Sequence, residues 1–519
     1  MMETIVSFLN DIVWSWPLPV LLVVVGLYFS LRMKFFQVRY LKDMLRLMLK
    51  GEKSDQGISS FQAIAVTLAG RVGTGNIVGV STAIFLGGPG AVFWMWLIAF
   101  LGAGSAFAES TLAQVYKQRE DAQYRGGPAY YLEKGIGGTF GKIYGMLFAV
   151  VTVISCGILL PGIQSNSIAS SAVNAFPIDN WMIGVFIALI LGAVIFGGIK
   201  SIANVATILV PFMAVAYIIV AVIIVIMNIS EVPALLALIF RSAFGLEQQF
   251  AGILGAMIMI GIKRGLYSNE AGQGTGAHAA GATEVSHPAK QGLVQSFSVY
   301  IDTLFVCTAT ALMILMTGMY NVSDDNGGLI VDNGVYQEAA DGSRDVSGTV
   351  AFTQASIDKA FSSQDSFNID FIGFGSYFIA FALLFFCYTT ILAYYYIAET
   401  NVMYITRGKM TWLKPVLGVA LIASAVYGTL STADVAWMMG DAGVGMMAWI
   451  NVIGIIILQK PTLAIFKDYE RQYKLKKQGK LEGEIIYRPG ENDGLKGETF
   501  WHRRVHEVEN KAEYGYPKS

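Results

Sequence analysis

Long apolar blocks dominate the hydrophobic pattern of this chain. A membrane-spanning α-helix needs about 20 mostly apolar residues, and eleven blocks approach or exceed that length. They cover residues 16–31, 58–86, 91–116, 143–175, 182–197, 204–228, 248–276, 294–319, 371–400, 413–430 and 435–458. The pattern predicts an all-α integral membrane protein with about 11 transmembrane helices.

Two of these blocks are interrupted by glycine and polar residues, at 69–76 and at 261–276. Irregular backbone at membrane depth survives only where protein or a watery cavity satisfies its polar groups. Glycine also permits close helix packing, which is the alternative explanation. Packing alone does not account for Arg71, Asn269 and Glu270 in the same places. We interpret both interruptions as discontinuous helices that form a site.

The spacing of the two interruptions predicts an inverted repeat, because each opens a set of five helices and an odd number of crossings inverts the second set. In transporters, interrupted helices in matching positions mark a midplane site, where half-helix N-termini favour a carboxylate and unwound carbonyls favour a cation. The expected units are an N-terminal helix, first span and basic loop (1–57), a first five-helix repeat (58–228), an external connection (229–247), a second five-helix repeat (248–430), a last span (431–459) and a tail (460–519).

The composition supports a membrane protein. Hydrophobic residues make up 54% of the 519 residues and charged residues 14%, against roughly 25% charged in soluble domains. The net charge of −1 gives no basic field for nucleic acid. The three cysteines, Cys156, Cys307 and Cys387, lie in apolar blocks without disulfide or metal-binding spacing. The expected surroundings are therefore the lipid bilayer of a cell membrane.

The distribution of charge predicts the orientation. Lys and Arg collect after the first span, after the third span and in the tail, whereas the loop 320–370 holds nine acidic residues and only Arg344 and Lys359 as bases. Basic segments stay on the cytoplasmic side. We therefore expect the N-terminus and the acidic loop outside and the tail inside, partly helical at 467–480 and otherwise loose.

Several motifs resemble the alanine or glycine:cation symporter family. These are the runs at 68–77, 87–96, 107–109, 126–131 and 264–272, together with Asp302-Thr303 and Cys307–Ala311, within a resemblance that covers about 55 to 455. The resemblance implies the LeuT-type 5+5 inverted repeat with one extra N-terminal helix. It also implies symport of a small neutral amino acid, alanine or glycine, driven by Na⁺ or alternatively by H⁺, with a monomer sufficient for transport.

Backbone N–H groups at the first interruption are the expected donors to a substrate carboxylate, because glycine lets a ligand approach the main chain and the resuming helix presents its positive end. These donors belong to Gly73, Thr74, Gly75 and Asn76. Glycines that only form a kink are the alternative.

Polar residues elsewhere are expected to complete the substrate pocket. Gln164 and Asn166 lie two apart and so point to different helix faces; at most one faces the cavity directly, and we favour Asn166. The family often has Met where Gln273 stands, beside Gly274, and Trp where Tyr394 stands. A more polar, larger pocket would suit glutamine; neutral variation at positions away from the ligand is the alternative.

A Na⁺ site needs hard oxygen ligands, which Asn269 and Thr275 offer at the second interruption. The resemblance to LeuT-type transporters adds Thr389 and Thr390, which would join the carbonyl groups of Ala69 and Val72 in one Na⁺ site. A buried threonine more often bonds back to its own helix.

Asp302 and Asn76 offer a second cation position. A bare carboxylate in the membrane usually has a function, so Asp302 is a candidate ligand or proton carrier, with a structural ion pair as the alternative. We expect Arg71, Lys263 and Arg264 to pair with Glu109, Glu270 or Asp302.

Other functional classes fit less well. A channel would need a continuous pore lined by rings of carbonyl groups or charges, and two discontinuous helices in one chain favour alternating access instead. An enzyme would need a nucleophile–base pair or a metal cluster, yet His278, His287, His502 and His506 are all expected at the cytoplasmic side. The sequence therefore predicts a transporter rather than an enzyme.

Overall fold

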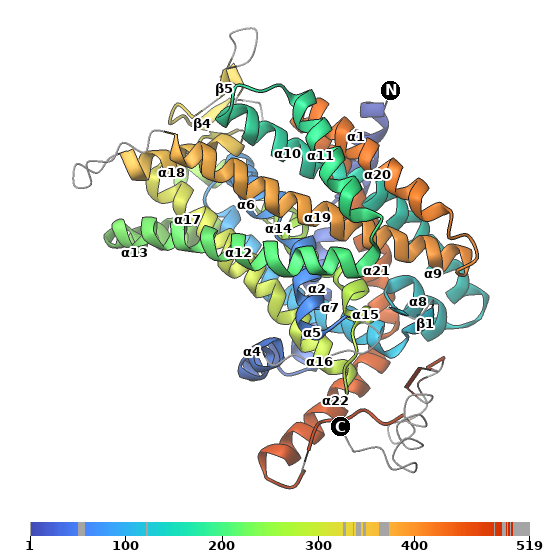
Figure 1. Cartoon of the computed structure of the whole chain (residues 1–519). Helices are drawn as coiled ribbons and strands as arrows, with labels where there is room; N and C mark the ends of the chain where they lie inside the picture. Colours follow the sequence, from blue (N-terminus) through green and yellow to red (C-terminus); the bar gives the residue numbers. More distant parts are fainter. Residues whose placement is uncertain are drawn as a thin grey trace.

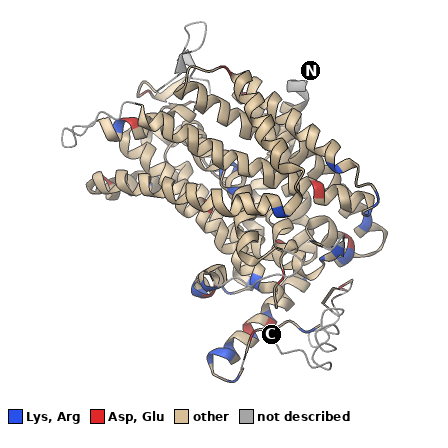
Figure 2. Cartoon of the chain, viewed as in Figure 1, with Lys and Arg blue, Asp and Glu red and all other residues tan. Residues whose placement is uncertain are grey.

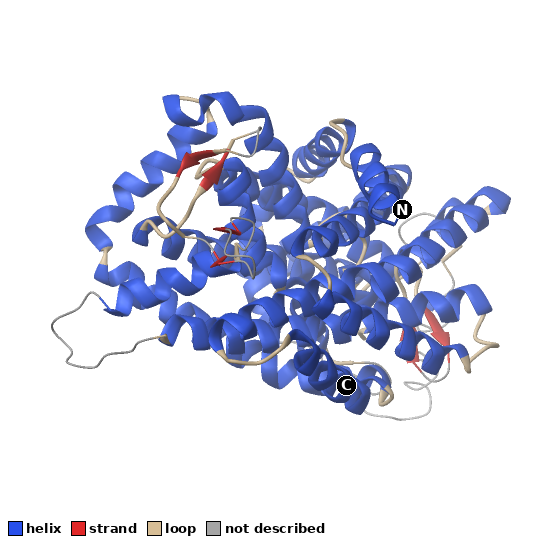
Figure 3. Ribbon diagram, turned by 90° about the horizontal axis from the view of Figure 1, so that it is seen from above, coloured by secondary structure: helices blue, strands red, loops and turns tan. Residues whose placement is uncertain are grey.

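The computed structural model is an almost entirely helical bundle, with strands confined to short hairpins (Figures 1 and 3). It describes residues 2–49, 58–120, 123–324, 328–335, 337–338, 344–345, 349–362, 373–481, 483–489, 495, 497–498 and 500–501. His502, His506 and parts of the basic and acidic loops lie outside these residues.

Each expected span coincides with helical structure. The helices are α1 (Met2–Val13), α2 (Pro17–Arg32), α5 (Ser60–Arg71), α6 (Thr74–Gly87), α7 (Ala91–Val115), α9 (Gly138–Ile154), η2 (Ser155–Leu159), α10 (Leu160–Ala175), α11 (Asn180–Ile195), α12 (Gly198–Met227), α14 (Leu254–Asn269), α15 (Gly276–Ala282), α16 (Pro288–Val299), η5 (Tyr300–Cys307), α17 (Thr308–Thr317), α19 (Phe374–Thr406), α20 (Leu413–Leu430) and α21 (Ala433–Ile457). Within the described residues, nine continuous or joined helices are long and apolar enough to cross a membrane; α1 and α2, bent by 42°, add a tenth as one span, and α11 is shorter. The number that cross the bilayer stays a prediction.

Smaller elements connect these helices at both ends of the bundle. They are α3 (Phe36–Arg39), α4 (Leu41–Leu49), α8 (Pro128–Tyr131), η1 (Leu132–Ile136), η3 (Ile229–Glu231), α13 (Val232–Ala243), η4 (Gln248–Ile253), α18 (Val350–Ser362) and α22 (Gln459–Lys477), with the antiparallel hairpins β1–β2 (Gln118–Glu120, Gln123–Arg125), β3–β4 (Val322–Ser323, Leu329–Val331) and β5–β6 (Gln337–Glu338, Arg344–Asp345).

The ends of the broken helices have local causes. The N-terminus of α5 is closed by a capping box, in which Ser59 and Gln62 satisfy each other's backbone N–H groups. At the other end α5 stops at Arg71, and extended Gly73 precedes α6. In the second broken helix, α14 ends where Glu270 adopts the left-handed conformation (φ 55°), followed by Gly272 and Gly274 at φ +94° and +92°.

The charged segments divide between two ends of the molecule (Figures 1 and 2). Basic residues gather on α4, around α8 and on α22 at one end, whereas the N-terminus, α18 and the hairpins of the acidic loop lie at the other. Figure 2 shows that most of the helical bundle between these ends carries few charges.

The tail is more ordered than expected. Its helix begins at Gln459 rather than near 467, and residues beyond it pack on the bundle. The Tyr487 N–H donates to the Ser286 carbonyl oxygen at 2.9 Å, and the Trp501 indole N–H donates to the Gln114 carbonyl oxygen at 2.9 Å. The expectation of a loose tail is therefore wrong for these residues, because buried aromatic side chains hold them.

The helices of membrane-spanning length bear on where the second repeat ends. Within the described part of 248–430, four helical segments have membrane-spanning length, and Ala433–Ile457 is the fifth. We therefore propose that the second set of five extends to Ile457 rather than ending at 430.

A buried ion-pair group anchors the second broken helix. Lys263 Nζ lies 2.7 Å from Asp441 Oδ2, and Arg264 pairs with Asp441 Oδ1. The Arg264 guanidinium also lies over the Trp437 ring, 4.1 Å from its centroid. The expectation that these two bases pair with Glu109, Glu270 or Asp302 is therefore wrong: α21 supplies their counter-charge.

We predict that Asp441→Asn strongly destabilises the protein, since it leaves the buried Arg264 and the partly buried Lys263 uncompensated, at a cost of about 3–5 kcal/mol. Thermal unfolding of the purified protein in detergent measures this. Asp434→Asn, at an exposed position of the same helix, serves as the control. Equal unfolding temperatures of the two variants would contradict the anchoring role.

Candidate functional site

At the break between α5 and α6, backbone carbonyl groups lose their helical partners, and one threonine hydroxyl lies within hydrogen-bond distance of two of them. The Thr390 hydroxyl in α19 lies 2.7 Å from the Ala69 carbonyl oxygen, 3.3 Å from that of Val72 and 2.9 Å from that of Phe386 in its own helix. One hydroxyl carries a single proton, so it cannot satisfy three acceptors at once. The oxygens of Thr390, Ala69 and Val72 therefore form a buried cluster with spare acceptor capacity, which fits a hard cation.

The backbone donors of the same break are held by two side-chain amides. The Gly73 N–H donates to Asn76 Oδ1 at 2.9 Å, and the Thr74 N–H donates to Gln164 Oε1 at 3.1 Å. Gly75 packs so closely against Ser268 that a Cβ added at Gly75 would lie 2.9 Å from the Ser268 Cα. The N-terminus of α6 thus directs its N–H groups at oxygen atoms, as a carboxylate-binding helix end does.

Asp302 lies at the centre of a polar cluster between the two broken helices. Its Oδ1 accepts from Asn76 Nδ2 at 2.6 Å, and its Oδ2 accepts from the hydroxyls of Ser268 at 2.8 Å and Thr303 at 2.7 Å. All these residues are buried. Because the Asn76 amide also accepts from Gly73, it connects Asp302 directly to the first break.

The second break is organised by Glu270. Its Oε2 accepts from the Thr275 hydroxyl at 2.7 Å, and its Oε1 accepts from the Tyr394 hydroxyl at 3.1 Å. A cavity of about 10 Å³ adjoins this carboxylate and is also lined by Thr67, whose buried hydroxyl has no hydrogen-bond partner within the described residues. A volume of this size holds about one water molecule.

Other expected site residues contact different parts of the bundle. The Thr389 hydroxyl bonds to Phe385 and Phe386 of its own helix. The Asn166 amide donates to the carbonyl oxygens of Gly428 and Ser431 at 3.1 and 2.8 Å. Of the two polar residues in α10, Gln164 rather than the favoured Asn166 therefore contacts the break.

Three further expected residues lie along the second break. The Asn269 amide donates to Thr303 and accepts from the Ala271 N–H. Gln273 Nε2 lies 3.8 Å from Met447 Sδ, and an added Cβ at Gly274 would meet Pro128 at 2.6 Å. Gln273 Oε1 is buried without a hydrogen-bond partner within the described residues, so it retains an acceptor for another group.

Sequence reasoning missed three contributors to the site: Thr67, Ser268 and Thr303. Each is a small hydroxyl residue, and such residues are common in membrane helices for packing reasons. Ser268 and Thr303 flank residues that sequence reasoning did select, namely Asn269 and Asp302. For Ser268 and Thr303, that adjacency is the one sequence signal that indicated a role in the site.

We predict that Gly73→Ala disrupts this site whereas Gly79→Ala, in α6, does not. An added Cβ at Gly73 would lie 2.6 Å from Thr390 Oγ1 and 2.8 Å from Gln164 Oε1, whereas at Gly79 its nearest neighbour is Trp437 at 3.7 Å. Overpacking costs about 1–3 kcal/mol, and Ala in a helix gains up to about 1 kcal/mol over Gly. Unfolding temperatures in detergent should fall for the first variant and hold or rise for the second; the reverse order would contradict this geometry.

Comparisons with known proteins agree on a single family. The sodium:alanine symporter family matches residues 1–483. A Bacillus subtilis (strain 168) protein named "Putative sodium/proton-dependent alanine carrier protein YrbD" is 53% identical over 98% of this chain and 99% of its own length. The "Probable sodium/glutamine symporter GlnT" of the same organism is 40% identical over 91% of this chain and 92% of its own.

A solved structure shares the fold. The crystal structure of MhsT in complex with L-phenylalanine superposes with a TM-score of 0.51 at 15% sequence identity, covering 83% of this chain and 94% of MhsT. At that identity the likeness concerns the fold, which confirms the expected LeuT-type architecture. The family match over almost the whole chain and the shared fold lead to one conclusion: this multi-pass membrane protein belongs to the sodium:alanine symporter family.

Proposed function

We propose that this chain is a secondary active transporter that couples Na⁺ to the uptake of a small neutral amino acid by alternating access. The observation that carries the proposal is the Thr390 hydroxyl, which lies within hydrogen-bond distance of the Ala69 and Val72 carbonyl oxygens. These oxygens come from two separate helices, α19 and the first broken helix. A cation bound there would be coordinated by both helices and would hold them together. Its release would remove that link and allow the helices to separate.

Na⁺ is the coupling ion that this oxygen set favours, since hard cations take hydroxyl and carbonyl oxygen ligands. Thr390 supports the proposal more strongly than Thr389, whose hydroxyl bonds to its own helix. Asn76 and Asp302 offer a second cation position, adjacent to the first through the Gly73 backbone. Asn269 and Thr275 remain candidate ligands at the second break.

The amino acid would bind at the start of α6. Its carboxylate would accept from the N–H groups of Thr74 and Gly75 and displace the Gln164 amide oxygen that Thr74 now contacts. Exchange of one oxygen acceptor for another keeps the N–H groups satisfied in both states. Gln164 could then donate its amide NH₂ to the bound carboxylate.

Alanine, glycine and glutamine are the proposed substrates. The names of two relatives mention alanine and glutamine. Among the described residues, the buried Gln273 amide oxygen has no hydrogen-bond partner, and the Tyr394 hydroxyl donates to Glu270; both polar groups would suit an amide side chain. Gly274 would then shape the pocket wall, and Asn166 would hold α10 against α20.

Proton coupling is the second candidate mechanism, because Asp302 and Glu270 are buried carboxylates beside the breaks and one relative's name includes proton dependence. Either ion would drive uptake into the cell if the basic end, with α4 and α22, faces the cytoplasm, as basic segments do in membrane proteins. The N-terminus would then lie outside.

We predict that Thr390→Ala raises the Na⁺ concentration for half-maximal uptake roughly tenfold or more, the effect of losing about 1.4 kcal/mol of binding. Thr389→Ala is the matched control and should change it less than about twofold, because the Thr389 hydroxyl bonds to carbonyl oxygens of its own helix. Labelled alanine uptake into proteoliposomes, as a function of Na⁺, measures both. Equal shifts in the two variants would remove Thr390 from the cation site.

We also predict which gradient drives uptake. An inward Na⁺ gradient should drive accumulation of labelled alanine, and unlabelled alanine, glycine or glutamine should compete with it. An uncoupler should leave this accumulation largely intact. Accumulation that ignores Na⁺ but collapses with the uncoupler would replace Na⁺ with H⁺ as the coupling ion.

A further inference from the structure

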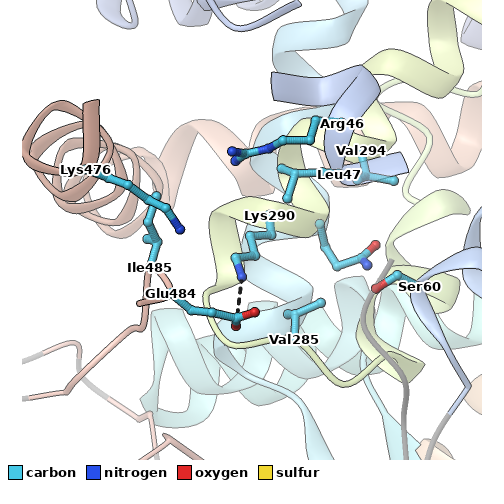
Figure 4. Close-up of a pocket in the computed structure, with 10 residues that line it drawn as sticks. Arg46, Leu47, Ser60, Val285, Lys290, Val294, Lys476, Glu484 and Ile485 are labelled. Atoms are coloured by element: carbon cyan, nitrogen blue, oxygen red, sulfur yellow. Dashed lines mark ion pairs between the residues drawn. The ribbon is translucent and has the colours of Figure 1, made fainter. Parts of the chain in front are cut away.

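A cavity of about 210 Å³ opens at the basic end of the molecule, at the opposite end of α5 from the first break (Figure 4). Four helices form it: α4, α5, α16 and α22. Val285 before α16 and the segment that follows α22 complete the lining. The cavity is several times the roughly 30 Å³ that one water molecule takes in the liquid, so it can admit a ligand of several heavy atoms.

The lining of this cavity is basic. Arg46 from α4, Lys290 from α16 and Lys476 from α22 approach the same space from three sides, and Glu484 is the acid among the lining residues (Figure 4). Glu484 lies 3.6 Å from Lys290 and its side chain is 63% exposed. An exposed ion pair of this kind contributes little, so an incoming anion can displace it.

Each base also holds a local partner that keeps it in place. Arg46 pairs with Asp43 in its own helix, and the Lys476 ammonium donates to the Gly483 carbonyl oxygen at 2.6 Å. The Lys290 ammonium donates to the Ser286 hydroxyl at 2.5 Å. These contacts hold the three positive charges in place beside the cavity.

A buried amide gives the second, independent indication of a ligand. Gln291 lines the cavity, is 1% exposed, and neither its oxygen nor its nitrogen has a hydrogen-bond partner within the described residues. An unsatisfied buried amide is costly. Gln291 lies in the first turn of α16 and Ser60 begins α5, so the positive ends of two helix dipoles lie beside the cavity and favour negative charge.

We propose that this cavity binds a phosphate group, with Arg46, Lys290 and Lys476 supplying the positive charge and the Gln291 amide a hydrogen bond. Phosphate oxygens accept several strong hydrogen bonds from such donors. The bound group would connect the start of α5, the first half of the broken helix, to α16 and α22. The site would therefore influence the helix that carries Ala69 and Val72.

Two sources could supply the phosphate group. The apolar side chains of Leu41, Leu45 and Leu49 are exposed along one face of α4, as in a helix that lies on a membrane surface, and this places the cavity beside lipid headgroups. A soluble phosphate compound could enter from the aqueous side. The chemistry of the site is the same in both cases.

The double variant Arg46→Gln/Lys476→Gln tests the proposal. Both residues are exposed on their helices, and Lys42→Gln/Lys477→Gln removes two positive charges from the same two helices outside the cavity lining. Titration calorimetry with inorganic phosphate, at constant ionic strength in neutral detergent, measures the soluble arm. Native mass spectrometry of protein from phosphatidylglycerol nanodiscs, with phosphatidylcholine nanodiscs for comparison, measures the lipid arm.

We expect the first pair of substitutions to weaken binding at least tenfold and the control pair to change it less than twofold. Phosphate binding without lipid retention would identify a soluble ligand, and retention of phosphatidylglycerol without phosphate binding would identify a headgroup. The proposal fails if neither probe binds the wild-type chain, or if both pairs of substitutions weaken binding equally.

Gln291→Leu gives a separate test on folded protein. Removing an unsatisfied buried amide should raise the unfolding temperature in phosphate-free buffer while it lowers affinity for the probe that the wild type binds. Unchanged affinity in this variant would remove Gln291 from the site.

Discussion

The satisfaction of backbone polar groups inside an apolar bundle is the constraint on which the rest of this structure depends. Where α5 stops and α6 begins, N–H and C=O groups lose their helical partners in a region without bulk water, and each unsatisfied group is costly. Thr390, Gln164 and Asn76, from three different helices, meet these groups. The break is therefore the point where α6, α10 and α19 are held in register.

On the proposed function, the same hydrogen bonds explain how a break that must be satisfied structurally can also bind ligands. A threonine hydroxyl or an amide oxygen that satisfies the backbone can give way to a cation or a carboxylate, because the ligand offers an equivalent contact. An apolar side chain in the same place would make no hydrogen bond that a ligand could replace. The proposal implies that the cost of breaking the helix is offset in both the free and the bound state, so that binding and release can repeat.

Parts of this arrangement could be predicted from the sequence and others could not. Glycine with polar residues inside apolar blocks located both breaks, because these residue types are unusual there. Choosing between Thr389 and Thr390, or between Gln164 and Asn166, requires the rotation of each helix. Residues two apart differ by about 200° around a helix, and the π-helical turn η2 before α10 shifts its phase. Pairing of Arg264 with Asp441, 177 residues away, leaves no local signal at all.

The central claim is that the cation and the amino acid share one site at the first break, and reciprocal binding tests it most directly. The dissociation constant of alanine should be measured on purified protein with and without saturating Na⁺, and that of Na⁺ with and without saturating alanine. Shared binding predicts that each ligand tightens the other by the same factor, as linkage requires. Affinities that are independent of the other ligand would contradict the account.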